Sequence, residues 1–172
     1  YGIRYRAKGL KIGLGYNRSV AISEREHELD TIYDLVPHPI FFLARYHTKP
    51  IRNKLVFGTS NKEKCYYEHW NELFDLCNKE YEVIKLGELG DTYSVSKCID
   101  IIASAQCFIG VDSGLMHVAD ALKVPGIAMW GKTSLTRNRP LNSIITLQNG
   151  LCINPVLIKL YAEKAMRGEL LP

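Results

Sequence analysis

The sequence contains no apolar run close to the roughly 20 residues that a membrane-spanning helix needs. It also shows no N-terminal stretch with the charged, apolar and small-residue regions of a secretory signal. From these two absences we expect a cytoplasmic protein. The five cysteines are scattered, odd in number and without C-x-x-C spacing, which argues against a disulfide framework and against a zinc site. We therefore expect reduced, mostly buried thiols.

Charged residues are not arranged in the patterns that indicate nucleic acid or metal ions. The formal net charge is +4, but no dense stripe of Lys and Arg with interleaved aromatic residues is present, so nucleic-acid binding is not favoured. No Asp-x-Asp pair and no cluster of His and Asp indicates a divalent metal ion, and we expect no cofactor. With 172 residues, 47% of them hydrophobic, the chain can bury a substantial core.

Apolar segments beyond Pro50 predict strands and helices in alternation. Strands are expected at residues 54–58 and 81–86. Residues 107–111 and 126–130 are near-continuous apolar runs, which are typical of parallel strands buried on both faces. Apolar stripes at helical spacing are formed by Trp70, Leu73, Phe74 and Cys77, and by Val95, Cys98, Ile99 and Ile102. A last helix is expected at residues 155–167, ended by Gly168. This order predicts an α/β fold with a doubly wound parallel sheet.

The first 50 residues have a different character. A short strand is expected at residues 2–5, followed by a basic loop with several glycines at residues 8–15. Ser23 and Glu26 form a capping box, which predicts a helix that ends at Pro37. The prolines from Pro37 to Pro50 indicate a linker. We therefore divide the chain into residues 1–50 and residues 51–172.

The most informative segment follows the apolar run at 107–111. Asp112, Ser113 and Gly114 form a polar turn that leads into a helix containing His117. A helix N-terminus presents unpaired backbone N–H groups and a partial positive charge, and Gly114 allows close approach of a ligand. Ser113 and His117 add side-chain donors, and we expect Asp112 to act as the N-cap that organises the loop. The pattern predicts a phosphate-binding site.

Two of these residues also have a purely structural interpretation. His117 could be hydrogen-bonded to Asp120 in its own helix, and Asp112 could serve only as a cap. A doubly wound sheet, however, binds ligands beyond the carboxyl ends of its strands. The loops expected there are residues 58–64, 87–92, 111–116 and 131–137.

The whole pattern resembles the lipopolysaccharide heptosyltransferases of glycosyltransferase family 9. Their donor site carries D-[ST]-G-x-x-H-x-A, then A-L-x-x-P, then a strand that ends in G-x-T. The matching positions are Asp112, Ser113, Gly114, His117, Ala119, Ala121, Leu122, Pro125, Gly131 and Thr133. Residues 15–29 and 59–70 resemble two earlier segments of the family, in the same order. The resemblance implies that residues 51–172 form the Rossmann-like C-terminal, nucleotide-sugar-binding domain of a GT-B glycosyltransferase. Residues 1–50 would be the end of the acceptor-side domain and the interdomain linker.

The resemblance also implies which residues contact the donor. Its diphosphate would be bound by Thr59, Ser60, Lys64, Asp112, Ser113, Gly114, Leu115, His117 and Thr133. Glu88 would lie near the nucleoside ribose, where a carboxylate can contact two neighbouring hydroxyls. Lys64 could equally be a solvated surface lysine, and Glu88 a turn residue.

The sequence departs from the family at three places. Residues 87–93 span a gap where the family inserts another helix and strand, which puts part of the nucleobase pocket in doubt. Position 132 is Lys in place of the usual Pro, and Asp120 replaces a small apolar residue. The family's general base lies upstream of everything in this sequence, so no catalytic residue is nominated.

The function implied by the resemblance is glycosyl transfer. A sugar would pass from a nucleotide-diphosphate donor, with ADP-heptose suggested by the family, to a lipopolysaccharide-type or other glycan acceptor, with inversion and without a metal. The partners would be that donor and a glycan or glycolipid acceptor, with peripheral membrane contact through a missing domain. Because the chain starts without Met, near the end of the family's first domain, we expect it to be inactive alone.

Three other functions remain open at this stage. The chain could be an inactive nucleotide-sugar-binding module or a degenerate paralogue that lacks the catalytic domain. It could be a nucleotide-processing enzyme of flavodoxin-like type, which would need a carboxylate of its own near the pocket. A nucleic-acid-binding role ranks last.

Overall fold

A computed structural model describes residues 3–4, 11–12, 49–60, 62 and 65–170. The chain divides into two compact units, residues 1–42 with 134–139 and residues 43–133 with 140–172. In the first unit, β1 (Ile3–Arg4) pairs antiparallel with β2 (Lys11–Ile12), and α5 (Leu135–Asn138) forms a single turn. The strand predicted at residues 2–5 is confirmed. The prediction of a loop at residues 8–15 is wrong at residues 11–12, which form β2. The helix predicted after Ser23 lies outside the described residues.

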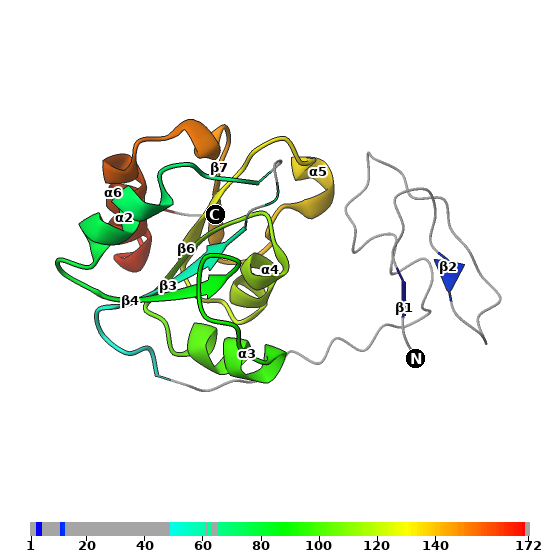
Figure 1. Cartoon of the computed structure of the whole chain (residues 1–172), viewed down its shortest axis with the longest axis horizontal. Helices are drawn as coiled ribbons and strands as arrows, with labels where there is room; N and C mark the ends of the chain where they lie inside the picture. Colours follow the sequence, from blue (N-terminus) through cyan, green and yellow to red (C-terminus); the bar gives the residue numbers. More distant parts are fainter. Residues whose placement is uncertain (1–2, 5–10, 13–48, 61, 63–64, 171–172) are drawn as a thin grey trace. The chain divides into compact units, whose positions relative to one another are not determined.

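The second unit contains a five-stranded parallel sheet (Figure 1). Its strands are β3 (Lys54–Thr59), β4 (Glu82–Gly87), β5 (Cys107–Val111), β6 (Gly126–Met129) and β7 (Ile144–Leu147), in the spatial order β4-β3-β5-β6-β7. The helices are α2 (Trp70–Cys77), α3 (Val95–Ala103), α4 (Gly114–Ala121) and α6 (Pro155–Met166), with a 3-10 turn, η1 (Gly150–Cys152).

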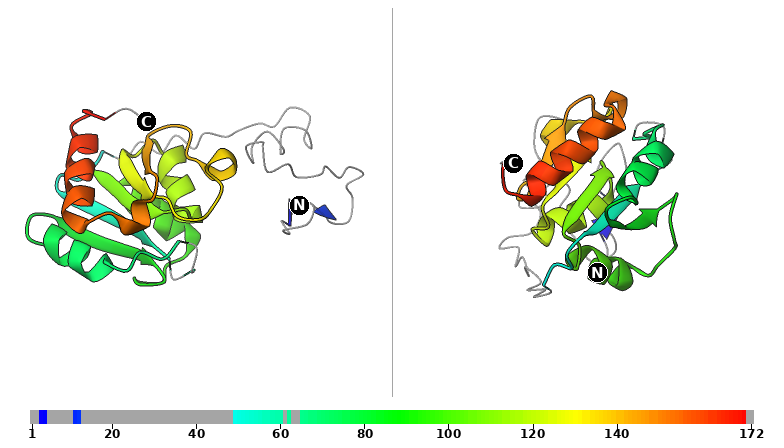
Figure 2. Two further views of the ribbon diagram at one scale, coloured as in Figure 1. Left: turned by 90° about the horizontal axis from the view of Figure 1, so that it is seen from above. Right: turned by 90° about the vertical axis from the view of Figure 1, so that its left-hand side faces the viewer.

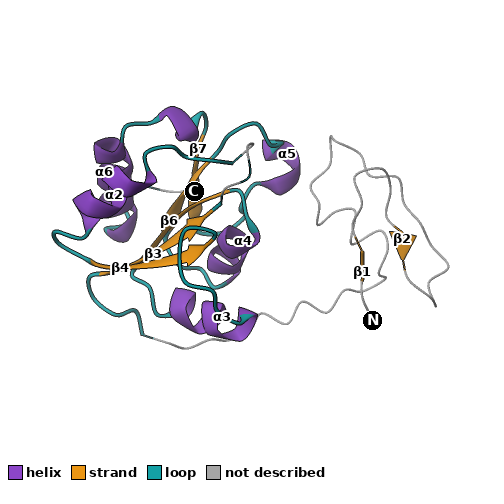
Figure 3. Cartoon of the chain, viewed as in Figure 1, coloured by secondary structure: helices purple, strands orange, loops and turns teal. Residues whose placement is uncertain are grey.

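Helices cover both faces of this sheet (Figure 3). Helices α2 and α6 contact each other on one face, as Figure 2 also shows, and α3 and α4 contact each other on the opposite face. Strands β5 and β6 are buried throughout, as their apolar sequences predict. The doubly wound α/β fold is therefore confirmed.

Aromatic rings form the centre of the core on the α2 face. The ring of Phe57 meets those of Trp70 and Phe74 edge-on, with centroids 6.2 and 5.2 Å apart, and the last two rings stack on each other. All four residues of the predicted α2 stripe are buried. The same apolar cluster includes Ile109 of β5 and Ile158 of α6.

The apolar stripe predicted for α3 is wrong in its first turn. Val95 is 75% exposed, whereas Ile101, Ile102 and Ala103 are buried. Only the last turn of α3 packs into the core, so the apolar residues of its first turn remain at the surface.

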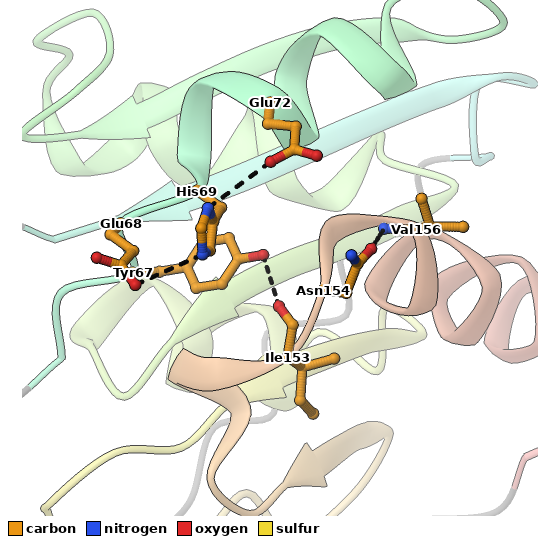
Figure 4. Close-up of polar contacts among 7 residues, drawn as sticks. All are labelled: Tyr67, Glu68, His69, Glu72, Ile153, Asn154 and Val156. Atoms are coloured by element: carbon orange, nitrogen blue, oxygen red, sulfur yellow. Dashed lines mark hydrogen bonds and ion pairs between the residues drawn. The ribbon is translucent and has the colours of Figure 1, made fainter.

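Two further elements were not predicted from the sequence. Strand β7 is only four residues long and half-buried, which is too short for a clear periodicity, and η1 is a single turn. Helix α6 agrees with its prediction. Asn154 caps its start by accepting a hydrogen bond from the Val156 N–H at 2.8 Å (Figure 4). Gly168 follows its end with φ +68°.

None of the cysteines is paired, as predicted. Cys65, Cys77 and Cys107 are buried, Cys98 is half-buried and Cys152 is exposed. Burial raises the pKa of the Cys77 thiol to about 11, which disfavours the reactive thiolate. In the described part of the chain, no helix combines the length and the apolar character needed to cross a bilayer.

Asp120 joins α4 to the beginning of β7. Its buried carboxylate accepts hydrogen bonds from the backbone N–H groups of residues 141–144, at 2.8–3.2 Å, and from the side-chain amide of Asn142. Burial alone would raise the pKa of Asp120, but the hydrogen bonds from Leu141, Ser143 and Asn142 lower it below its ordinary value. The pairing of Asp120 with His117, considered from the sequence, is absent among the described residues.

We expect Asp120→Asn to lower the free energy of unfolding by roughly 2–4 kcal/mol at neutral pH, because the amide cannot accept all of these hydrogen bonds. A lowered folded-state pKa stabilises the fold above the unfolded-state pKa of about 3.9 and loses this effect as the pH falls through the folded-state value. The difference between wild type and variant should therefore shrink on acidification. Urea unfolding at several pH values measures it.

The exposed Asp75 of α2 provides the matched control. Asp75→Asn should change stability by less than about 0.5 kcal/mol. A loss in Asp120→Asn that stays constant from pH 7 to below pH 3 would show that the ionised carboxylate is not the cause.

Candidate functional site

The order of the strands creates a topological switch point between β3 and β5. The chain runs from β3 outward to β4, and then returns to the other side of β3 to form β5. Loops that follow β3 and β5 therefore leave the sheet toward opposite faces, and ligands of such sheets bind at this point. Gly58 pairs with Gly110 in the parallel register. The segments Thr59–Ser60 and Asp112–Ser113 thus leave neighbouring strands at the same edge.

Close packing around Phe108 holds α4 against this point. A Cβ atom on Gly58 would lie 2.4 Å from the Phe108 ring, and one on Gly110 would lie 2.6 Å from it. The same position above Gly58 is 3.4 Å from the Cβ of Leu115, in the first turn of α4. The absence of side chains at both glycines therefore lets the beginning of α4 approach the end of β3.

Ser113, not Asp112, is the N-cap of α4. Ser113 has extended backbone angles, and its hydroxyl accepts a hydrogen bond from the Met116 N–H at 3.5 Å. Its carbonyl accepts from the N–H groups of Met116 and His117. The prediction that Asp112 caps this helix is wrong, because the extended residue that precedes the first turn is one position later. Asp112 is half-buried at the end of β5.

The N-terminus of α4 faces open space. The N–H groups of Gly114 and Leu115 have no hydrogen-bond acceptor among the described residues. A Cβ atom on Gly114 would meet no atom within 4 Å. His117, one turn further along, is exposed and makes no side-chain hydrogen bond to a described residue. This end of the helix can therefore accept an anion.

Thr59 and Ser60 are buried and used by the fold. The Thr59 hydroxyl donates to the Leu86 carbonyl at 2.8 Å and accepts from the Leu89 N–H at 3.0 Å. It thus ties the loop after β4 to the end of β3. The Ser60 hydroxyl accepts from the Lys62 N–H at 3.2 Å. These hydroxyls shape the loops at the switch point.

The Thr133 hydroxyl, unlike those of Thr59 and Ser60, makes no hydrogen bond to a described residue. Its oxygen is buried and has no hydrogen-bond partner among the described residues. The Thr133 carbonyl accepts from the indole Nε1 of Trp130 at 2.9 Å, which closes the turn after β6. A buried hydroxyl without a partner is uncommon in folded proteins, and it marks a place where a ligand could supply an acceptor.

Glu88 and Lys64 remain less defined. Glu88 is exposed in the short connection after β4, where Asp91 returns to donate its N–H to the Lys85 carbonyl at 3.3 Å. Lys64 lies outside the described residues. The neighbouring Lys62 is exposed, and its side chain has no described partner.

A second polar group lies at the start of α2 (Figure 4). The His69 imidazole is 3.5 Å from the Glu68 carboxylate and 3.7 Å from that of Glu72. These side chains are 43–72% exposed, so the pairs add little stability. The adjacent Tyr67 hydroxyl donates to the Ile153 carbonyl at 2.8 Å, which connects this segment to the beginning of α6. The group serves the packing of two helices.

A hollow of about 370 Å³ opens at the opposite, amino edge of the sheet. Three of its charged lining residues are paired within the protein: Lys159 bridges Glu80 and Glu163, and Arg167 pairs with Glu169. None of the predicted site residues lines it. The described residues contain no group of three or more His, Cys, Asp or Glu side chains that could hold a metal ion.

Comparison with known proteins connects this geometry to a family. Residues 89–154 match the model of glycosyltransferase family 9 (heptosyltransferase). The C-terminal region is thus a partial match to glycosyltransferase family 9. The resemblance recognised in the sequence is confirmed over this region, which includes β5, α4 and β6.

Curated relatives agree with this match. The chain is 29% identical over 91 residues to lipooligosaccharide heptosyltransferase 2 of Campylobacter jejuni serotype O:6, covering 50% of the chain and 26% of the relative. It is 31% identical over 88 residues to lipopolysaccharide heptosyltransferase 2 of Escherichia coli K12, covering 51% of the chain and 24% of the relative. The chain therefore spans about a quarter of the length of these relatives.

Solved structures share the fold. E. coli heptosyltransferase WaaC, solved with ADP, superposes with a TM-score of 0.62 at 17% identity, over 87% of this chain and 60% of WaaC. E. coli ADP-heptose lipopolysaccharide heptosyltransferase II superposes with a TM-score of 0.54 at 19% identity, over 71% of this chain and 48% of the E. coli enzyme. The five-stranded sheet with its helices is thus the α/β fold of a GT-B domain.

The two threonines at the carboxyl edge provide a test of which hydroxyl the fold uses. We expect Thr133→Val to leave the free energy of unfolding unchanged or to raise it by up to about 1 kcal/mol, because it removes an unpaired buried hydroxyl. The same change at Thr59 should lower it by roughly 1–3 kcal/mol, because it leaves the Leu86 carbonyl and the Leu89 N–H unpaired. Chemical denaturation of both variants measures the difference. Equal losses would mean that the Thr133 hydroxyl has a partner within the protein.

Proposed function

We propose that this chain forms the nucleotide-sugar-binding part of a heptosyltransferase-like glycosyltransferase. The reaction is transfer of a sugar, with inversion and without a metal, from a nucleotide-diphosphate donor to a lipopolysaccharide-type or other glycan acceptor. The observation that carries the proposal is the open N-terminus of α4 at the switch point of the sheet, with two N–H groups that lack acceptors among the described residues. Residues 51–172 are the donor domain in this proposal.

The chemistry follows from where charge develops. Sugar transfer releases a nucleotide diphosphate, which gains negative charge as the glycosidic bond breaks. Fixed N–H donors at Gly114 and Leu115 and the side chains of His117 and Thr133 can stabilise this charge without rearranging during the reaction. Ser113 holds the helix start in place through its cap. Thr59 and Ser60 shape the neighbouring loop.

The donor is ADP-heptose in this proposal. Its support is the family match, together with the ADP in the WaaC structure. Glu88 would contact the ribose hydroxyls, and Lys64 the diphosphate. The acceptor is a glycan or glycolipid, and contact with a membrane surface would occur through a domain outside this chain. The reaction would take place in the cytoplasm.

We assign no general base to this chain. In the resembled family it belongs to the first domain, and the chain spans only about a quarter of its curated relatives. Closure of two domains across a hinge would bring base and donor together. We therefore assign binding of the donor, and not proton transfer, to the residues described above.

A second candidate function is a nucleotide-sugar-binding module that has lost catalysis. The short connection after β4 favours it, because the loop folds back onto Lys85 where the family has a further helix and strand. A complete enzyme and such a module share the donor site and differ in turnover.

Binding without turnover is the expected behaviour of the isolated chain. The 172-residue chain should bind ADP and release none from ADP-heptose in the presence of a glycolipid acceptor, because the resembled family has its general base in the first domain. Calorimetry and a coupled ADP-release assay measure the two properties, with the E. coli relative as the active control. Sugar transfer by the chain itself would show that it contains the catalytic base.

Substitutions at α4 test the site directly. Gly114→Val places methyl groups in the space where the phosphate would lie, and the open surroundings of Gly114 mean that the fold should tolerate it. His117→Ala removes one hydrogen bond to a charged group, worth roughly 1.5–3 kcal/mol. Both variants should bind ADP at least tenfold more weakly than wild type, with circular dichroism as the check on folding.

Adenosine provides the matched ligand control, because it lacks the phosphates. Its binding should change little in either variant. Equal losses for adenosine and ADP, or no loss for either, would mean that the segment from Asp112 to His117 is only a structural turn.

A further inference from the structure

The turn that follows β6 is fixed at both ends by Trp130. The backbone N–H of Trp130 donates to the Leu147 carbonyl at 2.9 Å, and its own carbonyl accepts from the Gly150 N–H at 3.0 Å. Its buried indole donates to the Thr133 carbonyl at 2.9 Å. These three hydrogen bonds hold residues 130–133 in one conformation.

This fixed turn carries two donors that the fold does not use. The Lys132 side chain is exposed and has no hydrogen-bond or ion-pair partner among the described residues. The Thr133 hydroxyl is buried, also without a partner in the described part of the chain. An ammonium and a hydroxyl on consecutive residues, both without acceptors among the described residues, are suited to an anionic oxygen group.

The sheet register places the turn beside the start of α4. Met129 of β6 pairs with Val111 of β5, so the residues that follow each strand emerge at the same edge. Asp112–Gly114 follow Val111, and Trp130–Thr133 follow Met129. The two segments that carry unused donors therefore leave neighbouring strands at the same edge: one has the N–H groups of Gly114 and Leu115, and the other has the side chains of Lys132 and Thr133.

A nucleotide diphosphate has two anionic groups joined by one oxygen. The N-terminus of α4 can bind one phosphate, because its two available N–H groups are adjacent. The second phosphate then needs a cation or further donors within a few ångströms. The long and flexible stem of a lysine suits this contact, since the ammonium acts as a point charge.

We propose that Lys132 binds the second, terminal phosphate of the nucleotide diphosphate. Lys132 thereby stabilises the leaving group as its charge grows, and selects diphosphates over monophosphates. This inference rests on the proposed function. Lys132 is a binding residue that acts through charge, and Thr133 supports it from the same turn.

The test compares three ligands and three variants of the 172-residue chain. Calorimetry with ADP, AMP and adenosine is carried out on wild type, Lys132→Ala, Lys132→Arg and Lys79→Ala. Lys79 is an exposed lysine after α2, at the other edge of the sheet, and has no partner among the described residues; its removal changes the net charge equally. Thermal unfolding checks that each variant is folded.

We expect Lys132→Ala to weaken ADP about tenfold and AMP less than about threefold, with adenosine unchanged. Lys132→Arg should retain most of the ADP affinity, and Lys79→Ala should match wild type. The dependence of ADP affinity on salt concentration should be weaker in Lys132→Ala, because one ionic contact is lost.

Each alternative result has a distinct meaning. Equal losses for ADP and AMP would overturn the assignment to the terminal phosphate. No loss for ADP in Lys132→Ala, combined with a loss in Gly114→Val, would overturn the role of Lys132 and leave the proposed function standing. A wild-type chain that binds neither nucleotide would overturn both.

Discussion

The arrangement of the candidate site depends on how closely β3, β5 and α4 approach one another. Phe108 covers Gly58 and Gly110, and a Cβ atom on either glycine would collide with its ring. Because these two positions lack side chains, the first turn of α4 reaches the end of β3. The helix N-terminus is thereby placed at the switch point of the sheet, where its unpaired N–H groups face open space. Packing on one face of the sheet thus determines the chemistry at its edge.

Much of this architecture could be predicted from the sequence. Apolar runs predicted β5 and β6, and the helical spacing of apolar residues predicted the buried face of α2, because the spacing of apolar residues depends directly on which side chains are buried. Parallel strands share one carboxyl edge, so the segments after β3 and β5 could be placed together before the structure was known. The family match over residues 89–154 supports the same reading of the Asp112–His117 segment.

The remainder depends on contacts between residues distant in sequence. Asp120 was seen as a replacement for a small apolar residue, but its carboxylate organises the chain 21 to 24 positions later. Thr59 and Thr133 were equivalent candidates in the sequence. Of these two threonines, Thr59 has a hydrogen-bonded hydroxyl, and the Thr133 hydroxyl has no partner among the described residues. The N-cap of α4 is Ser113, one residue after the predicted Asp112, because both residue types are good caps and only the backbone angles distinguish them. The exposure of Val95 likewise depends on which turn of α3 reaches the core.

The short connection after β4 also affects how the chain meets other copies of itself. Strand β4 is at the edge of the sheet, and edge strands can pair with strands of other molecules. The backbone N–H of Asp91 donates a hydrogen bond to the Lys85 carbonyl, on the side of β4 that faces away from β3. The Lys85 ammonium lies 4.0 Å from the centroid of the Phe74 ring. A neighbouring strand would have to displace the loop and approach a positive charge. The same loop thus occupies the outer edge of β4 near its carboxyl end, where a strand of another molecule would otherwise pair.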